Sequence, residues 1–225
     1  MKRTISIICL VFLLGIGTFQ IYQHNDLSTI NSEEKIIKQS CVIPYKSQSD
    51  LTRDSDVIIR GTIKEILPSK WSNPDMEKGN HVRNILQTDV VVNITEIIKG
   101  TPYSQKKINV RINKGETDNA TIISDGYPDF VKDEDVLLFL STDDSDVVNK
   151  NENYYVLTGM IQGKYTITEK DNDIIISSSF DSRNQKSLSD FEKEIQHDMN
   201  YQENNSMQKM SPAEVQKNNE AVLGK

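Results

Sequence analysis

The sequence predicts an all-β fold: a small closed or partly open barrel of roughly six or seven strands, followed by one helix. The clearest evidence is the stretch Leu86–Ile98, in which β-branched residues alternate with polar ones as in a long half-buried strand. Shorter apolar runs lie on both sides of it, separated by segments rich in Gly, Pro, Asn and Asp. A sandwich of two sheets would show the same pattern and is the alternative.

The first 22 residues predict a membrane-targeting segment. Lys2 and Arg3 precede the apolar run Ile5–Ile21, whose length lies between that of a cleaved signal peptide and that of a spanning helix. We expect an uncleaved signal-anchor, with a cleaved signal peptide as the alternative. In both cases the positive residues stay in the cytoplasm and the rest of the chain lies outside it.

Three further regions follow this segment. Residues 23–49 are polar and predict a tether, with one helical turn near Glu33–Lys38. Residues 50–180 form the predicted barrel domain, which a short helix over Asp50–Asp54 precedes. Residues 181–225 predict a helix and a mobile tail. Cys41 is expected to be a free thiol, or else a cross-link between two copies outside the cell.

The first three strands are predicted to form a meander. Val57–Leu67 alternates, and Gly61 on its inner side predicts a bend or bulge. We expect Leu86–Ile98 to pair with this strand on one side and with Lys107–Ile112 on the other. Strict alternation would turn Glu96 inward, so the sequence predicts a bulge there or a strand end that reaches solvent.

The second half of the barrel is predicted from less regular patterns. Asn113–Asp135 is expected to be a long loop, and the apolar run Val136–Leu140 predicts a strand buried on both faces. A second meander is predicted after it, through turns at Gln162-Gly163 and at residues 171–173. Its strands are Tyr154–Met160, Lys164–Thr168 and Ile174–Ser177.

The C-terminal helix is predicted from a capping box and an apolar stripe. Ser189 and Glu192 have the spacing at which the two residues satisfy each other's backbone amides. Phe191, Ile195 and Met199 recur at helical spacing, which indicates a face that packs on the barrel.

Motifs for common chemistries are missing from the sequence. The three histidines have no second His or Cys at metal-ligand spacing, and the chain has no nucleophile elbow or phosphate-binding glycine loop. Lys106, Lys107 and Arg111 form the single basic cluster in a chain of net charge −7, so we expect no nucleic-acid partner. The sequence therefore favours a protein that is not an enzyme, without deciding the point.

Clustered carboxylates between Glu116 and Asp146 suggest one cofactor, a weakly bound calcium ion. Calcium prefers oxygen ligands on loops and is abundant outside cells. The candidate ligands are Asp125, Asp129, Asp143, Asp144 and Asp146. The alternative is that these acids are solvated turn residues and that the protein has no cofactor.

Three aromatic residues in loops are candidates for binding a ligand. Trp71, Tyr127 and Phe130 lie between predicted strands, where aromatic side chains suit contacts with a peptide or glycan. The same residues could instead cover the ends of the barrel core.

Several strand patterns together resemble a family. They are Ser55–Ile63, Thr88–Val92, Lys99-Gly100, Val136–Leu140 and Tyr154–Tyr165. Over about Ser49–Ser177 they resemble small, membrane-anchored or secreted β-barrel proteins of Gram-positive bacteria. The resemblance implies an OB-fold-like barrel, distantly similar in layout to netrin and metalloproteinase-inhibitor domains. The N-terminal cysteine and disulfides on which those inhibitors depend are missing here, so it implies no inhibitory role.

These observations predict a non-enzymatic binding or accessory module, tethered to the cell membrane by its N-terminal helix with its body outside, or secreted if that helix is cleaved. The expected partners are the membrane and an envelope protein, peptide or glycan. One alternative is a cell-envelope hydrolase that uses loop carboxylates such as Asp129 and Glu134. The other is a structural subunit of a membrane complex.

Overall fold

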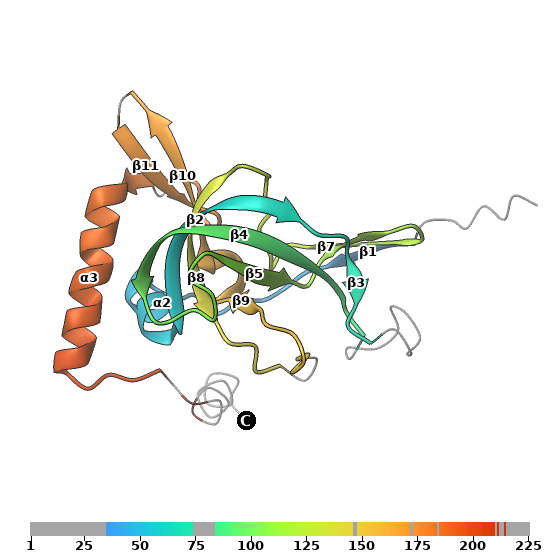
Figure 1. Ribbon diagram of the computed structural model, residues 1–225, viewed down its shortest axis with the longest axis horizontal. Helices are drawn as coiled ribbons and strands as arrows, with labels where there is room; N and C mark the ends of the chain where they lie inside the picture. The colour runs from blue at the N-terminus through green and yellow to red at the C-terminus, as the bar shows by residue number, and fades with distance from the viewer. Residues whose placement is uncertain are drawn as a thin grey trace, which may run out of the picture. The chain divides into compact units, whose positions relative to one another are not determined.

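The computed structural model describes residues 35–73, 84–145, 148–171, 173–183, 185–209, 211 and 214, which belong to one compact unit spanning residues 35–225 (Figure 1). The first elements are β1 (Lys35–Gln39), α2 (Gln48–Asp54), β2 (Val57–Ile66), β3 (Lys70–Trp71), β4 (Leu86–Lys99) and β5 (Lys107–Ile112). They are followed by β6 (Gly115–Thr117), β7 (Ala120–Ser124), β8 (Asp135–Ser141), β9 (Tyr155–Leu157) and the 3₁₀ helix η1 (Met160–Gly163). The last are β10 (Lys164–Lys170), β11 (Asp173–Ser178), β12 (Gln185–Ser187) and α3 (Leu188–Asn204).

Five strands close into a barrel, in the order β2, β4, β5, β9, β8 and back to β2. All neighbours are antiparallel except β5 and β9, which run parallel. The predicted β-barrel is thus confirmed, although roughly six or seven strands were expected in it. The sheet continues from β8 through β10, β11 and β12, which lie outside the closed ring. β9 pairs with β5 and β8 and reaches β10 only through η1, so the predicted second meander is reduced to the β10–β11 hairpin.

The long strand β4 pairs with β2 and β5, as predicted. The register with β2 shifts between Arg60 and Gly61, where a Cβ on the glycine would collide with the Asn93 carbonyl oxygen. The bulge predicted at Gly61 is therefore confirmed. Across from it, Glu96 turns outward with its side chain 51 % exposed and pairs with Arg60 at 3.0 Å, as the predicted bulge requires.

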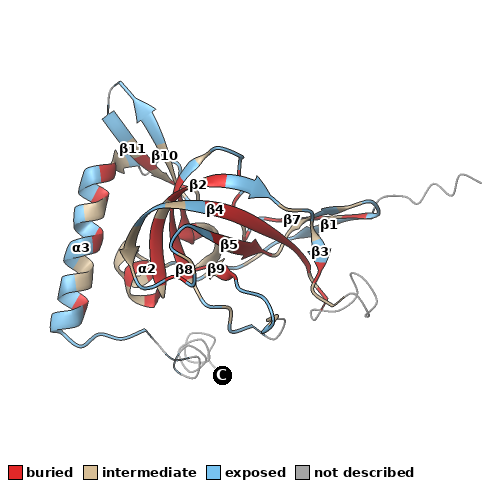
Figure 2. Ribbon diagram, viewed as in Figure 1, coloured by how far each residue is buried: buried red, intermediate tan, exposed pale blue. Residues whose placement is uncertain are grey.

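Two hydrophobic cores lie on the two faces of β2 and β8. Figure 2 colours residues of both strands as buried. The inner core fills the barrel with residues such as Ile59, Val92 and Leu138. The outer core lies under α3, where Ile58 and Phe139 meet the helix. Burial on both faces explains the continuous apolar run of β8.

The helix α3 packs on the outer core through Phe191, Ile195 and the partly buried Met199, which confirms the predicted stripe. The predicted capping box at Ser189 is wrong. Helix α3 begins at Leu188 directly after β12, and its N-cap Ser187 makes no side-chain capping hydrogen bond. Pairing of Ser187 with Ile175 in the sheet fixes the helix start earlier than the local sequence predicts.

A separate three-stranded sheet, in the order β1-β7-β6, occupies regions predicted to be a tether and a loop. Residues 35–39, expected to form a tether with a helical turn, pair in parallel with β7, and β6 and β7 form a hairpin within Asn113–Asp135. Ala120 and Ile122 attach this sheet to Trp71 and Leu86.

The helix α2 starts two residues before the predicted Asp50, where Ser47 and Asp50 form a reciprocal capping box. The predicted membrane segment Ile5–Ile21 lies outside the described residues. Within the described parts of the chain, no helix has both the length and the apolar character to cross a membrane.

Candidate functional site

The first candidate region is a charged cluster on the outer face of β4 and β5, made of Lys70, Asp89, Arg111, Glu152 and Tyr154. Arg111 and Asp89 form a bidentate ion pair, with Nε–Oδ1 and Nη2–Oδ2 distances of 2.7 and 2.8 Å. Arg111 also pairs with Glu152, and Lys70 pairs with both carboxylates, at 3.3 and 2.8 Å. The Arg111 guanidinium stacks on the Tyr154 ring, 3.7 Å from its centroid.

This charged cluster is closed by its own contacts. The side chains of Arg111 and Asp89 are only 2 % and 8 % exposed. Burial raises the pKa of the Asp89 carboxyl, but hydrogen bonds and charge from Arg111 and Lys70 outweigh burial, so that pKa lies below its ordinary value. Hydrogen bonds from Lys70 likewise lower the pKa of Glu152. Both carboxylates therefore stay ionised, and their charges are paired with Arg111 and Lys70.

The second candidate region is an aromatic pocket of about 270 Å³ beside α2, β11 and α3. It is lined by Tyr45, Lys46, Gln48, Leu51, Gln162, Tyr165, Ile176, Ser178, Phe180, Asp181, Lys186 and Phe191. Its floor belongs to the outer core, where the rings of Tyr165 and Phe191 lie 4.7 Å apart. At its rim, Tyr45 and Phe180 are 76 % and 49 % exposed, with ring centroids 6.5 Å apart.

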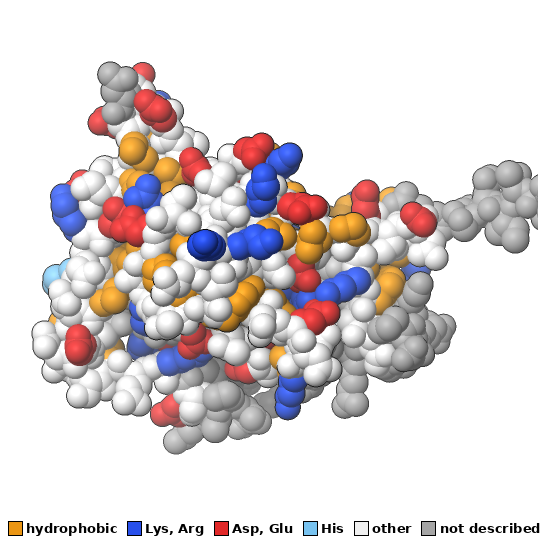
Figure 3. Space-filling view, viewed as in Figure 1, with side chains coloured by type: hydrophobic (Ala, Val, Ile, Leu, Met, Phe, Trp, Pro, Cys, Tyr) orange, Lys and Arg blue, Asp and Glu red, His pale blue; other side chains and the backbone are white. Residues whose placement is uncertain are grey.

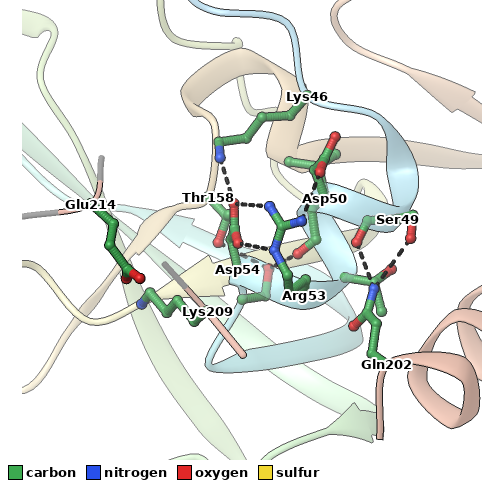
Figure 4. A network of polar contacts seen from close by, with 12 residues as sticks. Lys46, Ser49, Asp50, Arg53, Asp54, Thr158, Gln202, Lys209 and Glu214 are labelled. Atoms are coloured by element: carbon green, nitrogen blue, oxygen red, sulfur yellow. Dashed lines mark hydrogen bonds and ion pairs between the residues drawn. The ribbon is translucent and has the colours of Figure 1, made fainter. Parts of the chain in front are cut away.

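The wall of the pocket that carries Tyr45 is held by polar contacts to the body. Gln162, which is buried, accepts a hydrogen bond from the Lys46 backbone amide at 2.8 Å and donates one to the Pro44 carbonyl at 3.0 Å. The Lys46 ammonium pairs with Asp54 at 2.5 Å, and Arg53 on α2 pairs with the same carboxylate at 2.8 Å (Figure 4). This network fixes the chain before α2 against the pocket.

The polar side chains that line the aromatic pocket already have partners. Lys186 pairs with Glu194 at 2.6 Å, and Asp181 pairs with Arg183 at 3.0 Å. Burial raises the pKa of the Tyr165 hydroxyl to about 12, so this group is neutral at physiological pH. Polar and apolar side chains both contribute accessible surface to the pocket.

The three aromatics predicted to bind a ligand lie in packed positions away from this pocket. Trp71 is 9 % exposed and contacts Leu86, and Phe130 is 8 % exposed in the barrel core. Tyr127 is partly buried, and its hydroxyl accepts a hydrogen bond from Asn113 at 3.0 Å. These positions fit the alternative role of covering the core, while a role in binding stays a prediction.

The candidate calcium ligands lie in different local contacts. Asp125 accepts a hydrogen bond from the Cys41 amide at 2.7 Å, and Asp129 pairs with Lys114 at 2.6 Å. Asp143 accepts a hydrogen bond from Tyr154 at 2.7 Å, Asp144 is exposed, and Asp146 lies outside the described residues.

No three His, Cys, Asp or Glu side chains converge as a metal site among the described residues. Calcium binding stays a prediction, and a Ca²⁺ titration tests it because a ligand of the native state raises the melting temperature. Cys41 is a free thiol, 3.6 Å from the Ser124 hydroxyl.

The carboxylates named for a hydrolase are engaged in ion pairs. Glu134 accepts hydrogen bonds from Lys164 and Thr166, both at 2.6 Å, and the Lys164 side chain is only 4 % exposed. Asp129 is 94 % exposed and faces Lys114. Both carboxylates are thus engaged with cationic side chains of the protein, while their use in hydrolysis stays a prediction.

Sequence reasoning missed Tyr45 and Phe180, the two residues that form the rim of the pocket. One signal was present: Val42, Ile43 and Tyr45 form an apolar group inside a segment that is otherwise polar. Phe180 lies three residues after the end of the last predicted strand, and nothing in its local sequence shows that it meets Tyr45.

Comparisons with known proteins gave no matching family model and no matching curated protein.

Proposed function

We propose that the protein is a non-enzymatic, extracytoplasmic binding module, tethered to the cell membrane by its N-terminal segment, and that the aromatic pocket is its ligand site. The observation that carries this proposal is the pair of exposed rings, Tyr45 and Phe180, at the rim of a pocket with a buried apolar floor. Ligand sites are typically concave and apolar, with a few polar groups at defined positions. Exposed aromatic side chains beside such a pocket mark an interaction site more often than isolated surface residues do.

The proposed fold is OB-like, as in the Gram-positive β-barrel proteins that the sequence resembles. With β2, β4, β5, β8 and β9 taken as strands one to five, the first strand pairs with the second and fourth, and the third runs parallel to the fifth. OB-folds bind ligands on the face of strands two and three, between two flanking loops. Here that face carries the charged cluster, whose members bind one another. Because the groups of the charged cluster are already paired with one another, we favour the aromatic pocket as the ligand site.

The tether is supported by the apolar run Ile5–Ile21 and its preceding basic residues. In intact cells, an added protease should digest the body of the full chain, while the protein fractionates with the membrane. Recovery in the medium would indicate cleavage of the segment, and protection from the protease would contradict an extracytoplasmic body.

Site-specific photo-crosslinking tests the ligand site. A photoreactive amino acid at Tyr45 or Phe180 of the full-length chain should give the same adduct with an envelope component. Tyr201 is the matched control, because it is 54 % exposed but lies outside the lining of the pocket. The proposal is wrong if the two pocket positions give no adduct, or if position 201 gives the same adduct with equal yield.

A further inference from the structure

We infer that the aromatic pocket takes one apolar side chain, the size of leucine or phenylalanine, from an extracytoplasmic polypeptide. This inference rests on the proposed function of the pocket as a ligand site and names the chemistry of the ligand. Three features of the structure support it: the size of the pocket, its apolar floor, and the main chain that leads to its rim.

The size of the pocket suits a single side chain. A protein cavity of about 150 Å³ with apolar walls is large enough to bind benzene. The aromatic pocket, at about 270 Å³, therefore has room for one aromatic or branched aliphatic side chain with part of its main chain. A protein–protein contact often depends on one such anchor in a pocket that excludes water.

The floor of the pocket favours an apolar side chain. Leu51, Ile176 and Phe191 line the pocket and belong to the buried outer core. Both ends of the Gln162 amide are used to hold the chain at Pro44 and Lys46. Lys186 and Asp181 are paired with Glu194 and Arg183 but keep further donor and acceptor positions, which polar groups of the peptide main chain can use.

The stretch of chain that leads to Tyr45 at the rim of the pocket offers main-chain groups to a second chain. Within the described parts of the protein, no hydrogen bond reaches the main-chain groups of Val42, Ile43 or Tyr45. Val42 is fully exposed. An extended peptide can bind such a stretch through main-chain hydrogen bonds while a pocket selects one of its side chains. A lipid tail has no groups for these bonds.

Ligand-observed saturation-transfer NMR on the full-length protein in lipid nanodiscs tests the inference, with empty nanodiscs as the blank. The probes are capped pentapeptides of glycine whose central residue is Phe, Leu or Gly, together with triacetylchitotriose. The Phe and Leu peptides should show saturation at the central side chain. Tyr45→Ala should raise their dissociation constants at least about tenfold, because it removes the ring at the rim. Tyr201→Ala should leave them unchanged.

Each other outcome overturns the inference. Binding of triacetylchitotriose without the Phe and Leu peptides would identify a glycan site, and binding of pentaglycine equal to that of the Phe peptide would show that the pocket is not used. Unchanged affinity in Tyr45→Ala would place the contact outside the pocket. If none of the probes shows saturation transfer, the pocket does not bind an apolar side chain. If a crosslinked adduct forms at position 45 but no peptide shows saturation transfer, only this inference is wrong. If no adduct forms, the proposed function is wrong.

Discussion

The charged cluster on β4 and β5 and the aromatic pocket beside α3 both combine aromatic rings with charged groups, yet they differ in what they leave free. In the cluster, Tyr154 covers Arg111, and every charge has a partner of opposite sign within the molecule. In the pocket, the charges are paired as well, but Tyr45 and Phe180 project with much of their surface exposed. A region whose groups all bind one another stabilises the fold, whereas one that leaves apolar surface open at a concave site can bind a partner.

Charged and hydrophobic side chains are also distributed differently over the molecular surface. On the face that Figure 3 shows, basic and acidic side chains are interspersed, and hydrophobic side chains gather in patches between them. Mixed charges of this kind do not attract one class of partner over a long range. Specificity is therefore expected from a local, shape-dependent contact such as the aromatic pocket.

The largest effect is expected in the charged cluster. Arg111→Met should leave Asp89 buried without its main partner and should lower the free energy of unfolding by about 3–5 kcal/mol. Denaturant unfolding measures it. The double variant Asp89→Asn with Arg111→Met removes both charges and should be less destabilised than Arg111→Met alone. If Arg111→Met lowered the free energy of unfolding by less than about 0.5 kcal/mol, the charged cluster would contribute little to stability. The two regions would then not differ in the way described above.

The two regions also differ in how far the sequence predicts them. The alternation in Leu86–Ile98 predicts that Asp89 lies on the polar face of the strand, opposite Val90 and Val92, and the structure agrees. The pattern predicts no chemistry for this residue. The residue is buried because β3 and the segment before β9 bring Lys70 and Glu152 over the outer face of the barrel. Such coverage depends on loops, whose paths a periodic pattern does not encode.

The barrel itself could be predicted in more detail, because its signals are local. Gly61 and Glu96 each break the alternation within their own strand, and both breaks predict the observed bulge. In contrast, β1 pairs with β7, with Lys35 opposite Ala120, so its partner is distant in sequence. The aromatic pocket depends on the same kind of contact, since Tyr45 and Phe180 lie on opposite sides of the barrel strands in the sequence and their ring centroids are 6.5 Å apart in the structure.

A smaller effect is expected for Gln162, which links the pocket wall to the body. Gln162→Ala should leave the Lys46 amide and the Pro44 carbonyl without their partner and cost about 1–3 kcal/mol in the free energy of unfolding. The released wall should also weaken binding of the Phe pentapeptide. Gln162→Met is the matched control, because it keeps most of the side-chain volume and adds no charge while removing the same hydrogen bonds; it should be destabilised nearly as much as Gln162→Ala. No loss of stability in either variant would mean that the wall is fixed by other contacts.

The pH dependence of stability should report the cluster separately from the pocket. The pKa of Asp89 in the folded protein lies below the ordinary value of 3.8, so the unfolded state binds the proton more readily. The stabilisation by Asp89 is therefore complete above about pH 5 and is lost as the pH falls through the folded pKa. The difference in unfolding free energy between wild type and Asp89→Asn should shrink from pH 6 to pH 2.

Asp198 on α3 gives a control of opposite sign. Burial raises the pKa of its carboxyl, so the charged form lowers the stability of the folded protein. As the pH rises through that pKa, the free energy of unfolding of Asp198→Asn should therefore increase relative to that of the wild type. Parallel pH profiles for Asp89→Asn and Asp198→Asn would contradict the assigned ion pair at Asp89.

The smallest change in stability is expected at the rim of the pocket, where the effect on binding should be greatest. Tyr45→Ala and Phe180→Ala remove rings that are 76 % and 49 % exposed, so the free energy of unfolding should change by no more than about 0.5 kcal/mol. Loss of peptide binding in these stable variants would separate recognition from folding, because Arg111→Met should unfold the protein more easily without changing the pocket. If either rim variant instead destabilised the fold by several kcal/mol, its ring would serve as packing, and the aromatic pocket would resemble the charged cluster.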